Sequence, residues 1–315
     1  MNIQFIKIFK RSLVFILISA ILYILFIGVW GMFLPEKYSK NIKHKLGSSY
    51  LRFQEVENYK DIDLLFIGSS HAYRGLDTRI FENAGYTSFN LGTKAQTPIQ
   101  SAFLLEQYVA QLNPKIIVIE VYPKVFMIDG VESSINIVSN SLAKERVKLI
   151  FEHKNIQVLN SYIFSVLNNN FKEFKNIDAI ELPSMDTYIK GGYVERKMKL
   201  NNMKKHISLE MPFNEKQFTA LKEINNFLKK RAILPVYVFA PIVNKDYNSF
   251  KEKEAFESRI SKLGLYFDFN KIVKLNDTLH FFDSHHLNKD GVAIFNQKLI
   301  KVLDTLQNSN NLKME

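Results

Sequence analysis

Apolar runs of strand length alternate with segments of helical periodicity from residue 61 to residue 306, and this alternation restricts the fold more than any other feature. The two clearest runs are PKIIVIEVYP at 114–123 and LPVYVFAP at 234–241, each bracketed by prolines. Continuous β-branched and apolar runs of this length are typical of strands buried on both faces of a parallel sheet. We therefore predict an α/β fold, a three-layer sandwich whose mostly parallel sheet is covered by helices on both faces. Further strands are expected at 62–67, 87–91 and 265–269, and helices at 97–112, 214–231, 250–263 and 288–306.

One segment interrupts the alternation. Residues 124–212 are rich in Asn, Lys and Ser and carry amphipathic patches. A structureless loop of this length is uncommon in a compact domain, so we interpret the segment as a partly helical insertion or cap that could wall a site, with structural padding as the alternative. The domain is then expected over 61–306, with a polar juxtamembrane linker at 35–60 and a loose C-terminal tail at 307–315.

The N-terminus carries a long apolar segment. Residues 12–34, SLVFILISAILYILFIGVWGMFL, contain no charged residue, and as a helix they would extend over roughly 30 Å, enough to cross the hydrocarbon core of a bilayer. A cleaved signal peptide is the alternative, but the stretch is long and no Ala-x-Ala site closes it, so a retained single-pass anchor is favoured. Basic residues lie on both sides of the span, so charge bias does not decide its orientation. The simplest topology leaves residues 1–11 in the cytoplasm and the large domain outside the cytoplasmic membrane.

Composition excludes several classes of protein. The chain of 315 residues has no cysteine, which removes disulfides, thiolate metal sites and thiol catalysis. Its formal net charge is +11, but the lysines are interleaved with acids and no nucleic-acid-binding motif is present. The positive charge instead suits an anionic membrane surface or an acidic polymer, and no nucleic-acid partner is expected.

A candidate reactive site begins where the run 62–67 ends, at Gly68-Ser69-Ser70-His71. Serines in this place either cap a helix or act as a nucleophile, and a nucleophile needs a base and oxyanion donors. Asp283 and His286, three residues apart just before the final helix, could supply an oriented base. The three histidines 71, 285 and 286 form no His-x-x-x-His pair on one helix face, so neither a metal nor a cofactor is expected.

These blocks resemble those of the SGNH (GDSL-type) hydrolase superfamily, particularly its membrane-anchored DltD-like and polysaccharide O-acetylation branch. Gly68-Ser69-Ser70 is similar to the family's Gly-Asp-Ser block, with serine where aspartate is usual, and Gly92 resembles the glycine of the second block. Asp283-Ser284-His285-His286 resembles the final Asp-x-x-His block, and the order of the blocks matches. The third block departs, because no Gly-x-Asn follows the strand at 114–123.

The resemblance implies roles for single residues. Ser70 would be the nucleophile, His286 the base and Asp283 the group that orients it, with the amides of Ser70 and Gly92 as oxyanion donors. Tyr73, Arg74 and Asn90 are candidate substrate-binding residues. Tyr73, Arg74, Tyr122 or a residue of the insertion would have to replace the third-block asparagine, a donor typically worth roughly 3 kcal/mol.

The function predicted from these observations is acyl-ester chemistry at the outer face of the cytoplasmic membrane. Water as acceptor would make the protein a serine esterase, and a glycan hydroxyl would make it an O-acyltransferase. The expected partners are the membrane, through the N-terminal helix, a cell-surface glycan or acylated polymer, and a multi-pass membrane acyltransferase. The alternative is a catalytically silent, membrane-tethered binding or assembly protein with the same fold.

Overall fold

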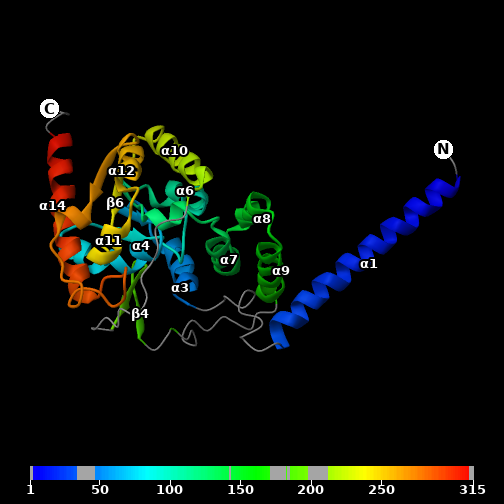
Figure 1. Cartoon of the computed structure of the whole chain (residues 1–315). Coiled ribbons are helices and arrows are strands. Elements are labelled where there is room, and N and C mark those ends of the chain that lie inside the picture. Colours follow the sequence, from blue (N-terminus) through cyan, green and yellow to red (C-terminus); the bar gives the residue numbers. More distant parts are fainter. Residues whose placement is uncertain are drawn as a thin grey trace.

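Figure 1 shows the computed structural model of the chain, which describes residues 3–33, 47–141, 143–170, 182, 185–197 and 212–311. Parts of the predicted linker, insertion and tail, and the last residue of the predicted membrane segment, therefore lie outside the described residues. The described part contains a five-stranded sheet with helices packed on it and one long helix that projects away from the domain.

All pairings in the central sheet are parallel, in the order β2-β1-β3-β6-β7. Alternate residues of each strand enter two separate apolar clusters: Leu65 and Ile67 of β1 face one side of the sheet, and Leu64 and Phe66 face the other. All four are fully buried, which confirms the predicted sheet covered on both faces. The strands are β1 (Leu64–Ile67), β2 (Ser88–Asn90), β3 (Ile116–Glu120), β6 (Leu234–Phe239) and β7 (Leu265–Asp268).

The helices divide between the two apolar clusters. One cluster draws on α6 (Pro98–Leu112), α10 (Glu215–Lys229) and α12 (Lys253–Ser261), and the other draws on α5 (Thr78–Asn83) and α14 (Lys289–Asn311). The helix predicted at 250–263 is α12, and a further helix that was not predicted, α11 (Asn244–Ser249), precedes it; the buried Phe250 lies between the two. A one-turn helix, α13 (Phe269–Ile272), follows β7, and α14 continues five residues beyond its predicted end.

The described part of the predicted linker packs into the domain. Within α3 (Ser48–Glu55) and the following 3₁₀ turn η1 (Val56–Asn58), Phe53 and Val56 are fully buried in the same cluster as α6. Burial of two large apolar side chains makes residues from 47 onward part of the folded domain rather than a spacer.

The insertion contains helices and a hairpin. Its helical part comprises η2 (Pro123–Phe126), α7 (Val131–Asn140), η3 (Lys144–Val147), α8 (Lys148–His153) and α9 (Ile156–Asn170). The strands β4 (Asp186–Ile189) and β5 (Tyr193–Arg196) pair antiparallel in a separate two-stranded sheet, and β5 contacts the short helix α4 (Ser70–Gly75).

The N-terminal helix α1 (Ile3–Phe33) contains a segment, Ile3–Trp30, that is long and apolar enough to cross a membrane. An N-terminal signal sequence can also meet this criterion of length and composition. The last turns of α1 pack on α9, where Ile27 meets Phe164 and the Tyr23 hydroxyl bonds to the side chain of Asn160. The apolar N-terminal helix predicted from the sequence is therefore present.

Candidate active site

The site lies at the carboxyl ends of β1 and β3, where parallel sheets present their loops. β1 ends at Gly68, whose φ of +146° is a conformation that L side chains rarely adopt. A Cβ at this position would lie 2.7 Å from the Cβ of Glu120. Glycine is therefore required here both for its backbone angle and for the close approach to β3.

Ser69 and Ser70 divide the two roles that the sequence left open. Ser69 is the N-cap of the short helix α4 (Ser70–Gly75), and its Oγ accepts from the His71 amide at 3.3 Å. Ser69 is buried, whereas Ser70 begins the helix and is partly exposed. The cap and the candidate nucleophile are thus adjacent but distinct residues.

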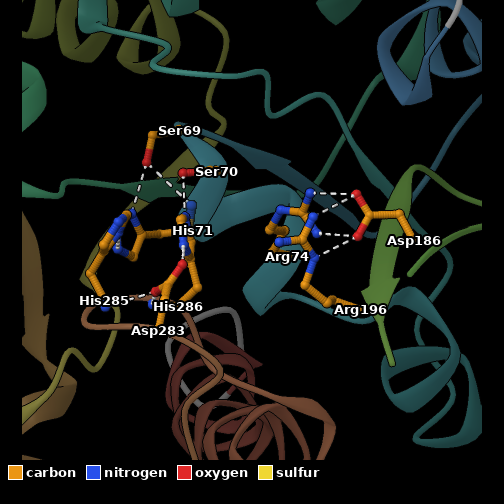
Figure 2. Close-up of polar contacts among 9 residues, drawn as sticks. All are labelled: Ser69, Ser70, His71, Arg74, Asp186, Arg196, Asp283, His285 and His286. Atoms are coloured by element: carbon orange, nitrogen blue, oxygen red, sulfur yellow. Dashed lines mark hydrogen bonds and ion pairs between the residues drawn. The ribbon is translucent and has the colours of Figure 1, made fainter. Parts of the chain in front are cut away.

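A hydrogen-bond relay joins Ser70 to the far end of the chain (Figure 2). The Ser70 Oγ lies 2.7 Å from His286 Nε2, and His286 Nδ1 lies 2.8 Å from Asp283 Oδ2. The other carboxylate oxygen of Asp283 accepts from the amides of His286 at 2.7 Å and His285 at 3.0 Å. The structure therefore brings Ser70, His286 and Asp283 together in the order that a nucleophile, its base and an orienting carboxylate require.

The loop that carries Asp283 and His286 is held by its own contacts. Phe281 and Leu287 form a bridge, and the Phe282 amide donates to the His286 carbonyl at 3.1 Å. The Phe282 ring stacks on the His286 ring, with centroids 5.3 Å apart and planes 8° apart. These contacts fix the imidazole in one orientation.

The charge states of the pair suit a neutral base. Burial lowers the pKa of His286, and its hydrogen bond with Asp283 opposes that change only in part. Burial alone would raise the pKa of Asp283, but the hydrogen bonds and charges of the neighbouring His286 and His285 hold that pKa below its usual range. At neutral pH, His286 is therefore uncharged beside an ionised carboxylate, so that Nδ1–H donates to Asp283 and Nε2 accepts from Ser70.

A second hydrogen-bond chain runs behind the first. Ser69 Oγ donates to Glu120 Oε2 at 2.7 Å and lies 3.1 Å from His71 Nδ1, while His71 Nε2 lies 3.3 Å from His285 Nδ1. Burial raises the pKa of Glu120 to about 7, although its hydrogen bonds from Ser69 favour the charged form. Burial likewise lowers the pKa of His285, to about 3, so both this histidine and the buried His71 are neutral at pH 7.

The structure places Asn90 and Gly92, the predicted substrate-binding residue and oxyanion donor near β2, in hydrogen bonds within the protein. The Gly92 amide donates to Asn90 Oδ1 at 3.0 Å, and Asn90 Nδ2 donates to the carbonyls of Ala72 and Leu76. The fully buried Asn90 side chain therefore holds α4 onto the sheet rather than facing substrate, and the prediction that it binds substrate is wrong for this geometry. The Gly92 amide would have to exchange its bond to Asn90 before it could receive an oxyanion.

Gly92 nevertheless has a steric role. A Cβ there would lie 2.9 Å from the Ala72 Cβ and 3.0 Å from the Tyr73 amide nitrogen, so only glycine lets β2 approach α4. Ser70 is the first residue of α4, and its amide is among the N–H groups that no helical carbonyl can accept. That amide remains available as an oxyanion donor.

Arginines flank the other side of the relay (Figure 2). Both oxygens of Asp186 bind Arg74, at 3.1 and 2.7 Å, and Arg196, at 2.7 and 3.3 Å. The buried Tyr73 ring packs against the guanidinium groups of Arg52 and Arg74, which lie 5.1 and 5.2 Å from its centroid. A contact of Tyr73 with substrate stays a prediction. Arg74 lies close enough to His286 to lower its pKa further.

Sequence reasoning did not single out Glu120, Asp186 or Arg196. Glu120 is the single acid within a buried strand, and that pattern is a signal that could have identified it. Tyr122, a predicted replacement for the third-block asparagine, packs against His71 with the ring centroids 4.1 Å apart and the planes tilted by 42°. Its buried hydroxyl has no hydrogen-bond partner in the described part of the chain. A cleft of about 540 Å³ lies elsewhere, between α6 and α10, and no residue of the relay lines it.

Comparisons with known proteins find similarity in structure only. No family model matches the chain, and no curated protein matches its sequence. Solved structures similar to it include a GDSL-like lipase from Bacteroides thetaiotaomicron, with 11% identity and a TM-score of 0.43 over 82% of this chain and 98% of the lipase. A protein of Bacteroides fragilis assigned as an acylhydrolase has 11% identity and a TM-score of 0.42 over 81% of this chain and 94% of its own. An acetyl xylan esterase from Butyrivibrio proteoclasticus is also similar, with 10% identity and a TM-score of 0.34 over 79% of this chain and 65% of the esterase. At this level of similarity the comparisons assign neither a substrate nor the role of any residue.

Proposed function

We propose that this chain is a membrane-anchored serine esterase or O-acyltransferase that acts on acyl esters of a cell-envelope glycan or polymer. The observation that carries the proposal is the relay of Ser70 Oγ to His286 Nε2 at 2.7 Å and of His286 Nδ1 to Asp283 at 2.8 Å. A neutral imidazole held on one side by a carboxylate and facing a serine hydroxyl on the other is the arrangement that activates serine for attack on an acyl carbon.

The chemistry follows from these contacts. Ser70 Oγ attacks the acyl carbonyl while His286 Nε2 takes its proton, and Asp283 stabilises the imidazolium that forms. The Ser70 amide, at the start of α4, donates to the oxyanion. The tetrahedral intermediate collapses when His286 returns the proton to the departing alcohol, which leaves an acyl group on Ser70.

The second half-reaction decides between the two activities. His286 deprotonates the incoming acceptor, which attacks the acyl-serine and releases Ser70. Water gives hydrolysis, and a glycan hydroxyl gives transfer. The net charge of +11 favours an acidic polymer as the substrate or acceptor.

A fluorophosphonate probe, which reacts with activated serines, tests the nucleophile on the full chain in detergent. We expect the wild-type protein to be labelled and Ser70→Ala to remain unlabelled. Ser69→Ala is the matched control: it removes the neighbouring hydroxyl and the helix cap but leaves the relay, so labelling of Ser70 should persist. Absence of labelling in the wild type, or equal labelling of Ser70→Ala, would sink the proposal.

The rival is a catalytically silent binding or assembly protein. One observation favours it: the Gly92 amide is engaged by Asn90, so the Ser70 amide is the clearest oxyanion donor at the site. The same probe separates the two functions, because a binding protein has no need of a reactive serine.

The proposed location is the outer face of the cytoplasmic membrane, with α1 as the anchor and a multi-pass membrane acyltransferase as the proposed partner that supplies acyl groups. A reporter that is active only outside the cytoplasm, fused after residue 315, should be active. Activity from a cytoplasmic reporter at the same position would place the domain inside and remove the envelope substrate.

A further inference from the structure

Three imidazoles gather beside Ser70. His71 comes from α4, while His285 and His286 come from the loop before α14, more than 200 residues later (Figure 2). The ring centroids of His285 and His286 are 3.8 Å apart, and each lies about 5 Å from the ring of His71, at 5.1 and 5.0 Å. One ring nitrogen from each histidine lies within 4.8 Å of the other two.

The spacing of these nitrogens suits a metal ion. Zinc binds imidazole nitrogens at 2.0–2.1 Å in tetrahedral geometry, which places two such nitrogens roughly 3.3 Å apart. His71 Nε2 and His285 Nδ1 lie 3.3 Å apart already. His286 Nε2 would supply the third nitrogen in exchange for its hydrogen bond with Ser70 Oγ.

The outer contacts of two of these rings are those of metal ligands. His286 Nδ1 is held by the carboxylate of Asp283, at 2.8 Å. His71 Nδ1 is held by Ser69 Oγ at 3.1 Å, and that hydroxyl is in turn bonded to the carboxylate of Glu120. Metal-binding histidines characteristically donate their second nitrogen to a carboxylate, directly or through a polar group, which fixes the tautomer and directs the lone pair inward.

We propose that a zinc-class divalent cation binds His71, His285 and His286 and thereby holds the protein in an unreactive state. Bound metal occupies the Nε2 lone pair of His286, which is the acceptor of the Ser70 proton in the proposed reaction. Metal binding itself rests on the geometry of the three rings, and only the inhibition rests on the proposed function.

The protons balance without any co-reactant. His71 keeps its proton on Nδ1, directed at Ser69, and His286 keeps its proton on Nδ1, directed at Asp283. His285 moves its proton from Nδ1 to Nε2, which frees Nδ1 for the metal. The Ser70 hydroxyl retains its proton and loses its acceptor, so three neutral imidazoles coordinate one cation with no net release of protons.

The test uses the full metal-free chain in detergent. Titration with Co²⁺, a spectroscopic substitute for zinc, should produce the visible absorption of a tetrahedral nitrogen site at one ion per chain, and Zn²⁺ should displace it. Zn²⁺ should slow fluorophosphonate labelling of Ser70 by about tenfold or more, and a chelator should restore the rate.

His285→Gln removes one proposed ligand and keeps all three residues of the Ser70–His286–Asp283 relay. It should weaken Zn²⁺ binding by about tenfold or more, and its labelling rates measured with and without Zn²⁺ should be nearly equal. His153→Gln, a histidine of α8 outside the cluster, is the matched control and should bind and respond as the wild type does.

Binding that is absent, or that His285→Gln leaves unchanged, would overturn the metal site. Stoichiometric binding with unchanged Ser70 labelling would overturn the inhibitory role. If Ser70 is never labelled, the proposed function fails, but the Co²⁺ spectrum and the Zn²⁺ titration still report on the site.

Discussion

Replacing Glu120 with glutamine should make the stability of the protein less dependent on pH. Glu120 is 4% exposed on the central strand β3, and burial raises its pKa from 4.5 to about 7. The folded chain therefore holds the Glu120 proton to a higher pH than the unfolded chain does. At a pH between 4.5 and 7, unfolding therefore releases the proton. The contribution of Glu120 to the free energy of unfolding falls as the pH rises through this range.

The size of the effect follows from the two pKa values. Integrating the linkage relation from pH 5 to pH 8 gives a loss of about 2.5 kcal/mol, which corresponds to roughly 5–10 °C in Tm for a domain of this size. Glutamine has nearly the same shape, and its oxygen can still accept from the Ser69 hydroxyl. Any cost of burying its NH₂ group is the same at both pH values and cancels from the comparison.

Thermal unfolding of the full chain in detergent, followed by circular dichroism at pH 5 and pH 8, measures the change. The Tm of Glu120→Gln relative to the wild type should rise by several degrees between the two conditions. Glu223→Gln, an exposed position on α10, is the control and should show no such rise. The same Tm difference at both pH values would refute the assignment of a buried carboxyl that resists ionisation.

Two further substitutions probe the site. Asp283→Asn should slow fluorophosphonate labelling of Ser70 by about 10⁴-fold, because the asparagine NH₂ group would donate to His286 Nδ1 and leave the ring proton on Nε2. A loss below tenfold would contradict the orienting role of Asp283. Gly92→Ala should lower the free energy of unfolding by about 1–3 kcal/mol, because the added Cβ would lie 2.9 Å from the Ala72 Cβ. Chemical denaturation measures this loss, and an unchanged midpoint would contradict the close packing of the segment after β2 on α4.

Much of the architecture was predictable from local patterns. The runs around residues 64–67, 116–120 and 234–239 are apolar on both faces and bounded by prolines or glycine, so their length and composition indicated buried parallel strands before any pairing was known. The loops at the ends of such strands meet at one edge. That rule placed Ser70 near a site, and the order of the blocks directed attention to Asp283 and His286.

Other features depended on contacts that no local pattern encodes. Phe53 and Val56 resembled part of a linker because their neighbours are polar, and only the tertiary packing shows that both belong to the cluster that includes residues of α6 and α7. The Gly92 amide was a plausible donor by position, but the direction of a backbone N–H depends on its turn, and here it meets Asn90.

The serines at the end of β1 show most clearly what the sequence determined and what the tertiary structure decided. The sequence by itself determined that a serine pair follows a buried strand and that an Asp-x-x-His segment precedes the last helix. Tertiary structure decided that Ser69 caps α4 and bonds to Glu120, that Ser70 faces His286, and that His71 lies against His285. Hydrogen bonds act over about 3 Å. Partners more than 200 residues apart in the chain can therefore be identified only after the strands and loops that carry them have packed together.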